Sequence, residues 1–165
     1  MTLERLWAGW RSEYVGAAQA DDGCVFCRIL ASDEAGETTY VVRRDDVCAV
    51  VLNAYPYTSG HLMVMPLRHV GDLEDLTADE ATGLWRNLAG AVRALKAGYS
   101  PDGLNVGANL GRSAGAGVPG HFHMHCVPRW NGDTNFMTTV AETRILPESL
   151  PATYEKITKA WPSDG

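Results

Sequence analysis

The chain has 165 residues, of which 45% are hydrophobic, and its formal net charge is −6 at pH 7. These values predict a single globular domain over residues 1–165 that buries its core without disulfides. The acidic balance, without a lysine or arginine cluster, excludes nucleic-acid binding as the main activity but leaves room for a free nucleotide. The longest apolar run, Val47 to Leu52, is far too short to cross a bilayer, so no membrane partner is expected.

The N-terminal residues 1–20 mix aromatic and charged side chains. They predict either an arm that packs across the domain or against a second subunit, or a simple extension. The segment has no apolar core of the kind that signal peptides carry, so we expect a cytoplasmic protein. In the cytoplasm, the four cysteines of the chain are expected to be reduced, which favours metal binding or burial over disulfides.

The first half of the chain predicts three strands. Residues 38–43 and 46–52 are rich in β-branched side chains and flank a predicted turn at Arg44-Asp45. After a loop over residues 53–60, a third strand is expected over residues 61–66, ended by Pro66.

The second half predicts two helices and two strands. Thr77 to Glu80 forms a capping box that opens a long helix, which Gly98 and Pro101 are expected to end near residue 97. A strand over 102–110, a glycine-rich loop over 111–120 and a histidine-bearing strand follow, and a shorter helix is expected over 147–161. This order predicts an α+β fold, an antiparallel sheet with one long helix and a shorter C-terminal helix.

Three of the five histidines alternate with apolar residues at positions 121, 123 and 125. Alternation with period two predicts a strand that presents the three imidazoles on one face and buries Phe122, Met124 and Cys126 on the other. A neutral imidazole can attack phosphorus while a neighbouring imidazole protonates the departing oxygen. The alternative is a purely structural or metal-binding histidine strand.

The glycine-rich loop lies directly before these histidines. Glycines let the backbone approach a phosphate closely, and successive N–H groups can form an anion-binding concavity. No Gly-Lys-Ser/Thr follows, so the loop is not a Walker motif. Together with the three histidines, it favours a site that acts on phosphate groups.

Cys24 and Cys27 are spaced as a metal-binding pair, and such a pair needs two further ligands to complete a tetrahedral zinc site. The alternative is two buried free thiols. A thioredoxin-like redox role lacks the βαβ context that it requires. Cys48 and Cys126 lie on predicted strands and are expected in the core.

The run from His121 to Val127 resembles the signature of the histidine triad (HIT) superfamily of nucleotide hydrolases and transferases. The resemblance extends over the loop and strand from Leu52 to Pro66 and over Val127 to Met137. It is most similar to one branch, the bacterial diadenosine tetraphosphate phosphorylases. It divides the chain into an N-terminal arm (1–20), a HIT core (24–139) and a C-terminal extension (140–165).

The resemblance implies a role for each site residue. His123 is expected to become nucleotidylated, His125 to contact the transferred phosphate and assist the leaving group, and His61 to support both. The implied substrate-binding residues are Asn53 at the ribose, Asn109 beside the phosphates, the backbone of Gly115, Ala116 and Gly117 at the phosphate oxygens, and Trp130 near the base.

The resemblance also implies partners. Some relatives complete a structural zinc site with two histidines, and the matching residues here are His69 and His121 beside Cys24 and Cys27. Adenine nucleotides are the implied substrates, and a homodimer is the implied assembly.

The chain departs from the family pattern before the triad. Typical HIT hydrolases carry a glutamine followed by Ser or Thr where this chain has Ala116-Gly117, and the phosphorylase branch often has an acidic residue where this chain has Gly120. The expected reaction converts diadenosine tetraphosphate and phosphate to ATP and ADP. The alternatives are hydrolysis of a dinucleoside polyphosphate, phosphoramidase activity and a nucleotide sensor without turnover.

Overall fold

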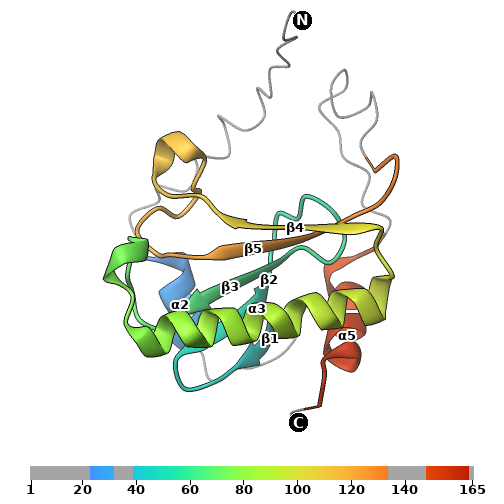
Figure 1. The fold of residues 1–165 in the computed structure, drawn as a ribbon, viewed down its shortest axis with the longest axis horizontal. Helices are drawn as coiled ribbons and strands as arrows, with labels where there is room; N and C mark the ends of the chain where they lie inside the picture. Colours follow the sequence, from blue (N-terminus) through green and yellow to red (C-terminus); the bar gives the residue numbers. More distant parts are fainter. Residues whose placement is uncertain (1–22, 32–38, 134–147, 164–165) are drawn as a thin grey trace, which may run out of the picture.

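The computed structural model describes residues 23–31, 39–133 and 148–163. Its centre is a five-stranded antiparallel sheet with the order β1-β2-β3-β5-β4 (Figure 1). The strands are β1 (Val41–Arg44), β2 (Cys48–Leu52), β3 (Leu62–Pro66), β4 (Gly103–Ala108) and β5 (Met124–Arg129). The helices are α2 (Val25–Ala31), α3 (Ala78–Tyr99) and α5 (Leu150–Ala160), with short 3₁₀ turns η1 (Leu73–Asp75) and η2 (Arg112–Ala114).

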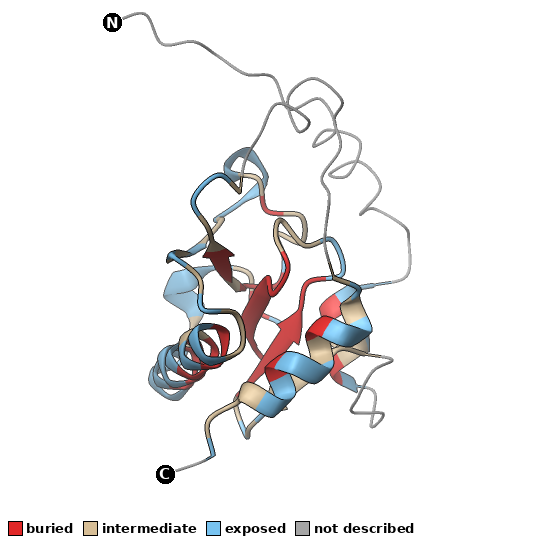
Figure 2. Ribbon diagram, turned by 90° about the vertical axis from the view of Figure 1, so that its right-hand side faces the viewer, coloured by how far each residue is buried: buried red, intermediate tan, exposed pale blue. Residues whose placement is uncertain are grey.

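Helices cover both faces of the central strands β2 and β3, and side chains alternate between the two faces along each strand. On one face the main core cluster joins the strands to α3 and α5, through residues such as Val50, Leu95 and Ile157. On the other face Phe26 and Leu30 of α2 pack against Met63 and other residues of β2 and β3. In Figure 2 the central strands β2 and β3 are accordingly red and the outward sides of the helices pale blue. β3 is buried on both faces, as its continuous apolar run predicts.

Helix α3 begins as the capping box predicts. The Thr77 side chain accepts a hydrogen bond from the Glu80 N–H, and the Glu80 carboxylate accepts one from the Thr77 N–H. The helix continues through Gly98 to Tyr99, two residues past the predicted end, and Ser100 forms a left-handed cap with φ +45°. At Gly98 the helix packs against α5, since a Cβ added there would lie 3.4 Å from the Ala160 Cβ.

The first predicted turn is wrong by about two residues. Arg44 belongs to β1 and β2 begins only at Cys48, so the turn spans residues 45–47. The reason is the Asp45 carboxylate, which accepts hydrogen bonds from the Val47 and Cys48 N–H groups and so folds the chain locally. The sequence also gave no prediction of α2, a helix of only seven residues.

The histidine strand begins later than predicted. β5 starts at Met124, so His121 and His123 precede it. The ladder between β3 and β5 ends at Val64 and Met124, and the Phe122 N–H instead donates to the Val70 oxygen at 2.6 Å. The predicted division between faces is nevertheless confirmed, since Phe122, Met124 and Cys126 belong to the core cluster beneath α3.

Some predictions fall outside the described residues. The N-terminal arm and much of the C-terminal extension belong to these, so the subdivision at residues 20, 24 and 139 stays a prediction. Within the described part, the C-terminal helix is present as α5, and no helix is long and apolar enough to cross a membrane.

Candidate active site and metal centre

The three histidines predicted as catalytic lie together on the sheet face that α2 covers. His125 is on β5 opposite Met63, His123 immediately precedes β5, and His61 ends the loop that leads into β3. The ring centroids of His123 and His125 are 4.9 Å apart, and those of His61 and His125 are 5.1 Å apart. The loop and the two strands therefore bring residues 64 positions apart in the sequence into one cluster.

Hydrogen bonds assign the protons of the His61–His125 pair. The backbone N–H of Tyr57 donates to His61 Nδ1 at 3.1 Å, so that nitrogen is an acceptor and Nε2 carries the proton. His61 Nε2 then donates to His125 Nδ1 at 2.9 Å. A neutral His125 ring therefore carries its proton on Nε2, the tautomer that can donate to an oxygen.

The proton of His123 is assigned in the opposite sense. Its Nδ1 donates to the main-chain oxygen of His121 at 2.8 Å, so Nε2 carries the lone pair. Burial lowers the pKa of His123 below its usual range, and the bond to the carbonyl opposes that shift only in part. The ring is therefore neutral near pH 7 and has the tautomer of a nucleophile at Nε2.

Two aromatic residues that sequence reasoning did not assign to the site lie against these histidines. Phe26 of α2 packs edge-on against His121 and His123, with ring centroids 5.6 and 5.0 Å away. Tyr57 lies 4.5 Å from the His61 ring and 6.0 Å from the His125 ring. In the sequence, the only signal for Phe26 is its place between the two cysteines. The only signal for Tyr57 is its place four residues before His61.

Asn53, expected to hold a ribose, lies beside His61. Its amide nitrogen is 3.3 Å from His61 Nδ1, and its oxygen accepts a hydrogen bond from the Tyr55 N–H at 2.9 Å. The side chain is buried, so it takes part in fixing the loop that carries His61.

The glycine-rich loop closes on itself through the amides that we expected to bind phosphate, and their role stays a prediction. The Gly115 N–H donates to the Arg112 oxygen and the Ala116 N–H to the Gly111 oxygen. Of the three predicted amides, Gly117 is thus the one for which the described residues provide no backbone acceptor. Gly115 has φ +90°, a conformation that glycine adopts at no steric cost. In this conformation two of the three predicted donors are therefore already engaged.

The two remaining predicted binding residues follow β4 and β5. Asn109 comes directly after Ala108, which pairs with Met124, so the register brings its backbone close to His123. The Asn109 amide donates to the Gly115 oxygen at 3.3 Å and so fastens the base of the glycine loop. Trp130 follows β5, about 16 Å along the chain from His125 at ~3.3 Å per residue, and its ring meets Tyr99 of α3. The predicted place of Trp130 near the base stays a prediction.

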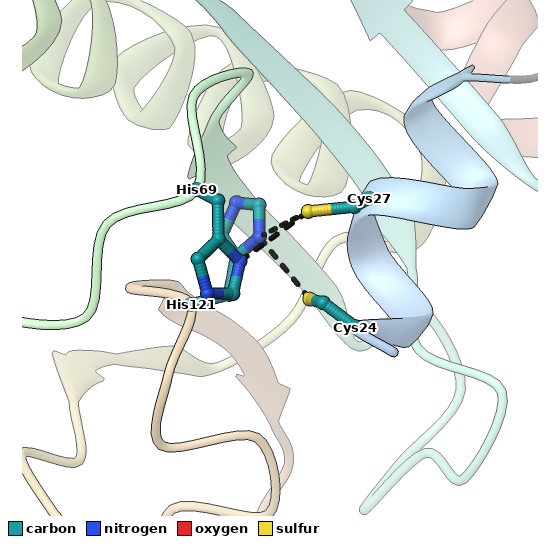
Figure 3. Close-up of side chains that lie close together, drawn as sticks. All are labelled: Cys24, Cys27, His69 and His121. Carbon is teal, nitrogen blue, oxygen red and sulfur yellow. Dashed lines mark hydrogen bonds between the residues drawn. The ribbon is translucent and has the colours of Figure 1, made fainter. Parts of the chain in front are cut away.

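The four predicted metal ligands form one cluster (Figure 3). Cys24 and Cys27 come from the start of α2, His69 from the loop after β3 and His121 from the segment before β5. His121 Nδ1 lies 3.4 Å from Cys24 Sγ and 3.6 Å from Cys27 Sγ, and Cys27 Sγ lies 3.3 Å from His69 Nδ1. All four ligand atoms lie within 4.8 Å of one another.

This cluster fits a tetrahedral zinc ion. With Zn–S near 2.3 Å and Zn–N near 2.05 Å, tetrahedral ligands are separated by about 3.5 Å between sulfur and nitrogen, close to the distances found here. His121 Nε2 donates to the Pro66 oxygen at 2.9 Å, which directs the lone pair of Nδ1 toward the thiols. A carbonyl acceptor on the far nitrogen is typical of metal-bound histidine.

The other two cysteines are core residues, as predicted. Cys48 and Cys126 are fully buried, and burial raises the pKa of each thiol to about 12. Neither contributes a thiolate at neutral pH.

Comparison with known proteins assigns the family. Residues 35–132 match the HIT domain. This chain belongs to the HIT family. It is 40% identical to the AP-4-A phosphorylase of Mycobacterium tuberculosis strain H37Rv, over 96% of this chain and 85% of that protein.

Solved HIT structures share the fold. A zinc-bound histidine triad family protein from Mycobacterium smegmatis is 29% identical, with a TM-score of 0.68 over 84% of this chain and 92% of that one. A hypothetical histidine triad nucleotide-binding protein from Sulfolobus tokodaii is 29% identical, with a TM-score of 0.67 over 83% of this chain and 91% of that one. The predicted α+β HIT fold and the predicted membership of the family are both confirmed.

Proposed function

We propose that this chain is an enzyme that cleaves dinucleoside polyphosphates by transferring a nucleotidyl group to His123 and then to inorganic phosphate. One observation carries the proposal: His123 and His125 are adjacent, and their hydrogen bonds leave a lone pair on His123 Nε2 and a proton on His125 Nε2. The 40% identity to an AP-4-A phosphorylase supports phosphate as the acceptor and an adenine nucleotide as the substrate.

The first step forms a phosphorus–nitrogen bond. His123 Nε2 attacks the α-phosphorus of diadenosine tetraphosphate, and the bond to the bridging oxygen breaks. The His125 Nε2–H donates a hydrogen bond to that oxygen, which leaves as an anionic phosphate oxygen and needs no proton. ATP leaves and an adenylyl group stays on His123. The neutral form of His123, favoured by burial, is the form that attacks.

The second step returns the enzyme to its starting state. A phosphate oxygen attacks the same phosphorus, the phosphorus–nitrogen bond breaks, and ADP is released. The His125 Nε2–H now donates a hydrogen bond to the attacking phosphate oxygen, and His123 leaves as a neutral imidazole. His61 holds Nδ1 of His125 throughout, so that the other nitrogen keeps its proton and stabilises the negatively charged oxygen in both steps.

Cys24, Cys27, His69 and His121 would hold a structural zinc ion. Four protein ligands complete its coordination, so zinc would stabilise the fold there and leave no position for substrate. A thiol-rich site of this kind needs a reducing compartment, which is why cytoplasmic location remains part of the proposal. Elemental analysis should find about one zinc per chain, and a folded metal-free protein would contradict this assignment.

A homodimer also remains part of the proposal. β4 is an edge strand of the described sheet, and its Val106 is 44% exposed. Trp85 on α3 is 67% exposed. Unprotected edges and exposed apolar side chains favour association. Sedimentation equilibrium would decide between a dimer and a monomer.

The reaction is tested with diadenosine tetraphosphate in the presence and absence of ¹⁸O-labelled phosphate. We expect ATP and ADP, with the label in the β-phosphate of ADP and no turnover without phosphate. AMP as a product that does not depend on phosphate would indicate a hydrolase, and tight binding without turnover would indicate a nucleotide sensor. His123→Ala should abolish turnover, whereas Met124→Leu, whose side chain packs on the opposite face, should retain it.

A further inference from the structure

The loop between β2 and β3 is held in one conformation by its own hydrogen bonds. The Asn53 N–H donates to the His61 oxygen at 2.9 Å, the His61 N–H to the Thr58 oxygen at 3.2 Å, and the Thr58 hydroxyl to the Pro128 oxygen at 2.9 Å. The last bond fastens the loop to β5, the strand that carries His125. A side chain on this loop therefore has a fixed position relative to both His61 and His125.

Tyr57 uses that position to contact both imidazoles. Its backbone N–H donates to His61 Nδ1 at 3.1 Å, and its ring centroid lies 4.5 Å from that of His61 at an interplanar angle of 41°. The same ring lies 6.0 Å from the His125 ring, nearly parallel to it at 27°. Apart from the histidines themselves, Tyr57 is the aromatic residue that lies against both members of the pair within the described part of the chain.

This placement constrains the bond between the two histidines. The 2.9 Å bond from His61 Nε2 to His125 Nδ1 requires both rings to keep their orientation. His61 is fully buried, and the half-buried Tyr57 ring covers it. Without that ring, the His61 imidazole can rotate away from the Tyr57 N–H as well as from His125 Nδ1. Water can then compete for both of its nitrogens, and the position of its proton is no longer enforced.

We propose that Tyr57 is a positioning residue: its ring holds the His61–His125 pair in the tautomer and orientation in which the His125 Nε2–H donates a hydrogen bond to the leaving group. Its catalytic consequence rests on the proposed nucleotidyl transfer. The tyrosine acts through its contacts with the two histidines. The contribution of the backbone N–H is separate, because every residue except proline supplies it at this position.

Two substitutions separate the ring from the hydroxyl. Tyr57→Leu removes the aromatic ring but keeps an apolar side chain and the backbone N–H. Tyr57→Phe keeps the ring and removes only the hydroxyl. Tyr55→Leu is the matched control, since Tyr55 lies two residues earlier on the same loop and is 67% exposed.

Kinetics with diadenosine tetraphosphate form the first arm of the test. Tyr57→Leu should lower kcat by about 10- to 100-fold, because a misdirected hydrogen-bond donor loses much of its effect, and should leave KM within about twofold. Tyr57→Phe should retain at least about half of the wild-type kcat, and Tyr55→Leu should match the wild type. Equal losses of kcat in Tyr57→Leu and Tyr57→Phe would assign the effect to the hydroxyl. Equal losses in Tyr57→Leu and Tyr55→Leu would assign it to the loop as a whole. Either result would overturn the proposal.

The second arm uses NMR and needs no substrate. In the wild type, ¹⁵N shifts of the imidazoles should report a protonated Nε2 and an unprotonated Nδ1 for His61. In Tyr57→Leu the two tautomers should mix, and in Tyr57→Phe they should not. An unchanged spectrum in Tyr57→Leu overturns the proposal. If the wild type cleaves no dinucleotide, the proposed function fails, while the NMR arm still decides whether Tyr57 orders the pair.

Discussion

The main-chain oxygen of His121 accepts a hydrogen bond from Nδ1 of His123 at 2.8 Å, while the imidazole of His121 lies between the thiols of Cys24 and Cys27. One residue therefore joins the metal cluster to the proposed nucleophile. Its ring is further fixed by the bond to the Pro66 oxygen. The contacts that hold the His121 ring therefore also fix the position of its main-chain carbonyl, and this carbonyl sets the tautomer of His123.

The double variant Cys24→Ser, Cys27→Ser tests this connection. We expect loss of bound zinc, a lower Tm, and a kcat reduced by about tenfold or more while KM changes little, because His123 loses its orientation rather than its substrate contacts. Metal content, thermal denaturation and steady-state kinetics measure these effects. Val25→Ser, between the two cysteines and partly exposed, should keep its zinc. Full activity in a zinc-free double variant would show that the two sites are independent.

Phe26 provides a second connection between α2 and the nucleophile. Its ring is 6% exposed and packs edge-on against His121 and His123. Phe26→Leu keeps much of the apolar volume, so we expect a loss of about 1 kcal/mol in the free energy of unfolding. Phe26→Ala should lose about 3 kcal/mol or more because it leaves a cavity. Urea denaturation compares the two, and equal losses would mean that the site collapses around the smaller residue.

Much of the fold was predictable because the responsible signals are local. The capping box at Thr77 and Glu80, the apolar run of β3 and the period of the histidines each act over a few residues. The turn after Arg44 was misplaced because a single side chain, Asp45, sets it through bonds to later N–H groups. Helix α2 was missed because its stability comes from packing of Phe26 on the sheet.

The features of the site that follow from residue type could be predicted from the sequence. The features that depend on contacts between distant residues could not. The metal cluster and the three clustered histidines follow from the motif resemblance. The engaged amides of Gly115 and Ala116 depend on the closure of the loop upon itself. The contacts of Tyr57 depend on how the β2–β3 loop packs against β5. That packing is visible only in the folded structure.

Glu80 should make the free energy of unfolding decrease at low pH. Its bidentate pairing with Arg68 is the main reason that its pKa falls to about 2, from an ordinary value of about 4.3. A lowered pKa gives stabilisation that is complete above about pH 4.3 and is lost as the pH falls toward 2. Arg68 is half exposed, so solvent screening limits the effect to about 1–2 kcal/mol.

The measurement compares Glu80→Gln with the wild type by urea denaturation at pH 7, 5 and 3. We expect the difference in unfolding free energy to be present at pH 7 and 5 and to shrink at pH 3. Glu74→Gln, at an exposed carboxylate in η1, should match the wild type at each pH. A difference between Glu80→Gln and the wild type that does not depend on pH would assign the contribution of Glu80 to packing instead of charge.

Two glycines of α3 should respond in opposite ways to alanine. A Cβ at Gly83 would lie 2.6 Å from Val47 Cγ2 and 3.0 Å from Cys48 Sγ, so the turn before β2 must move. A Cβ at Gly98 would lie 3.4 Å from the Ala160 Cβ, an ordinary contact. In both positions alanine also gains up to about 1 kcal/mol of helix propensity. The balance between this gain and the cost of overpacking therefore decides whether the alanine variant is more or less stable than the wild type.

We expect Gly83→Ala to destabilise the protein by about 1–2 kcal/mol, because overpacking costs more than the helix propensity that it gains. Gly98→Ala should stabilise it by about 0.5–1 kcal/mol. For a chain of this size, these changes correspond to Tm shifts of about 2–4 °C per kcal/mol, which differential scanning calorimetry resolves. Equal stabilisation in both variants would mean that the 45–47 turn yields without cost, so that close packing at Gly83 contributes nothing to the position of α3 on the sheet.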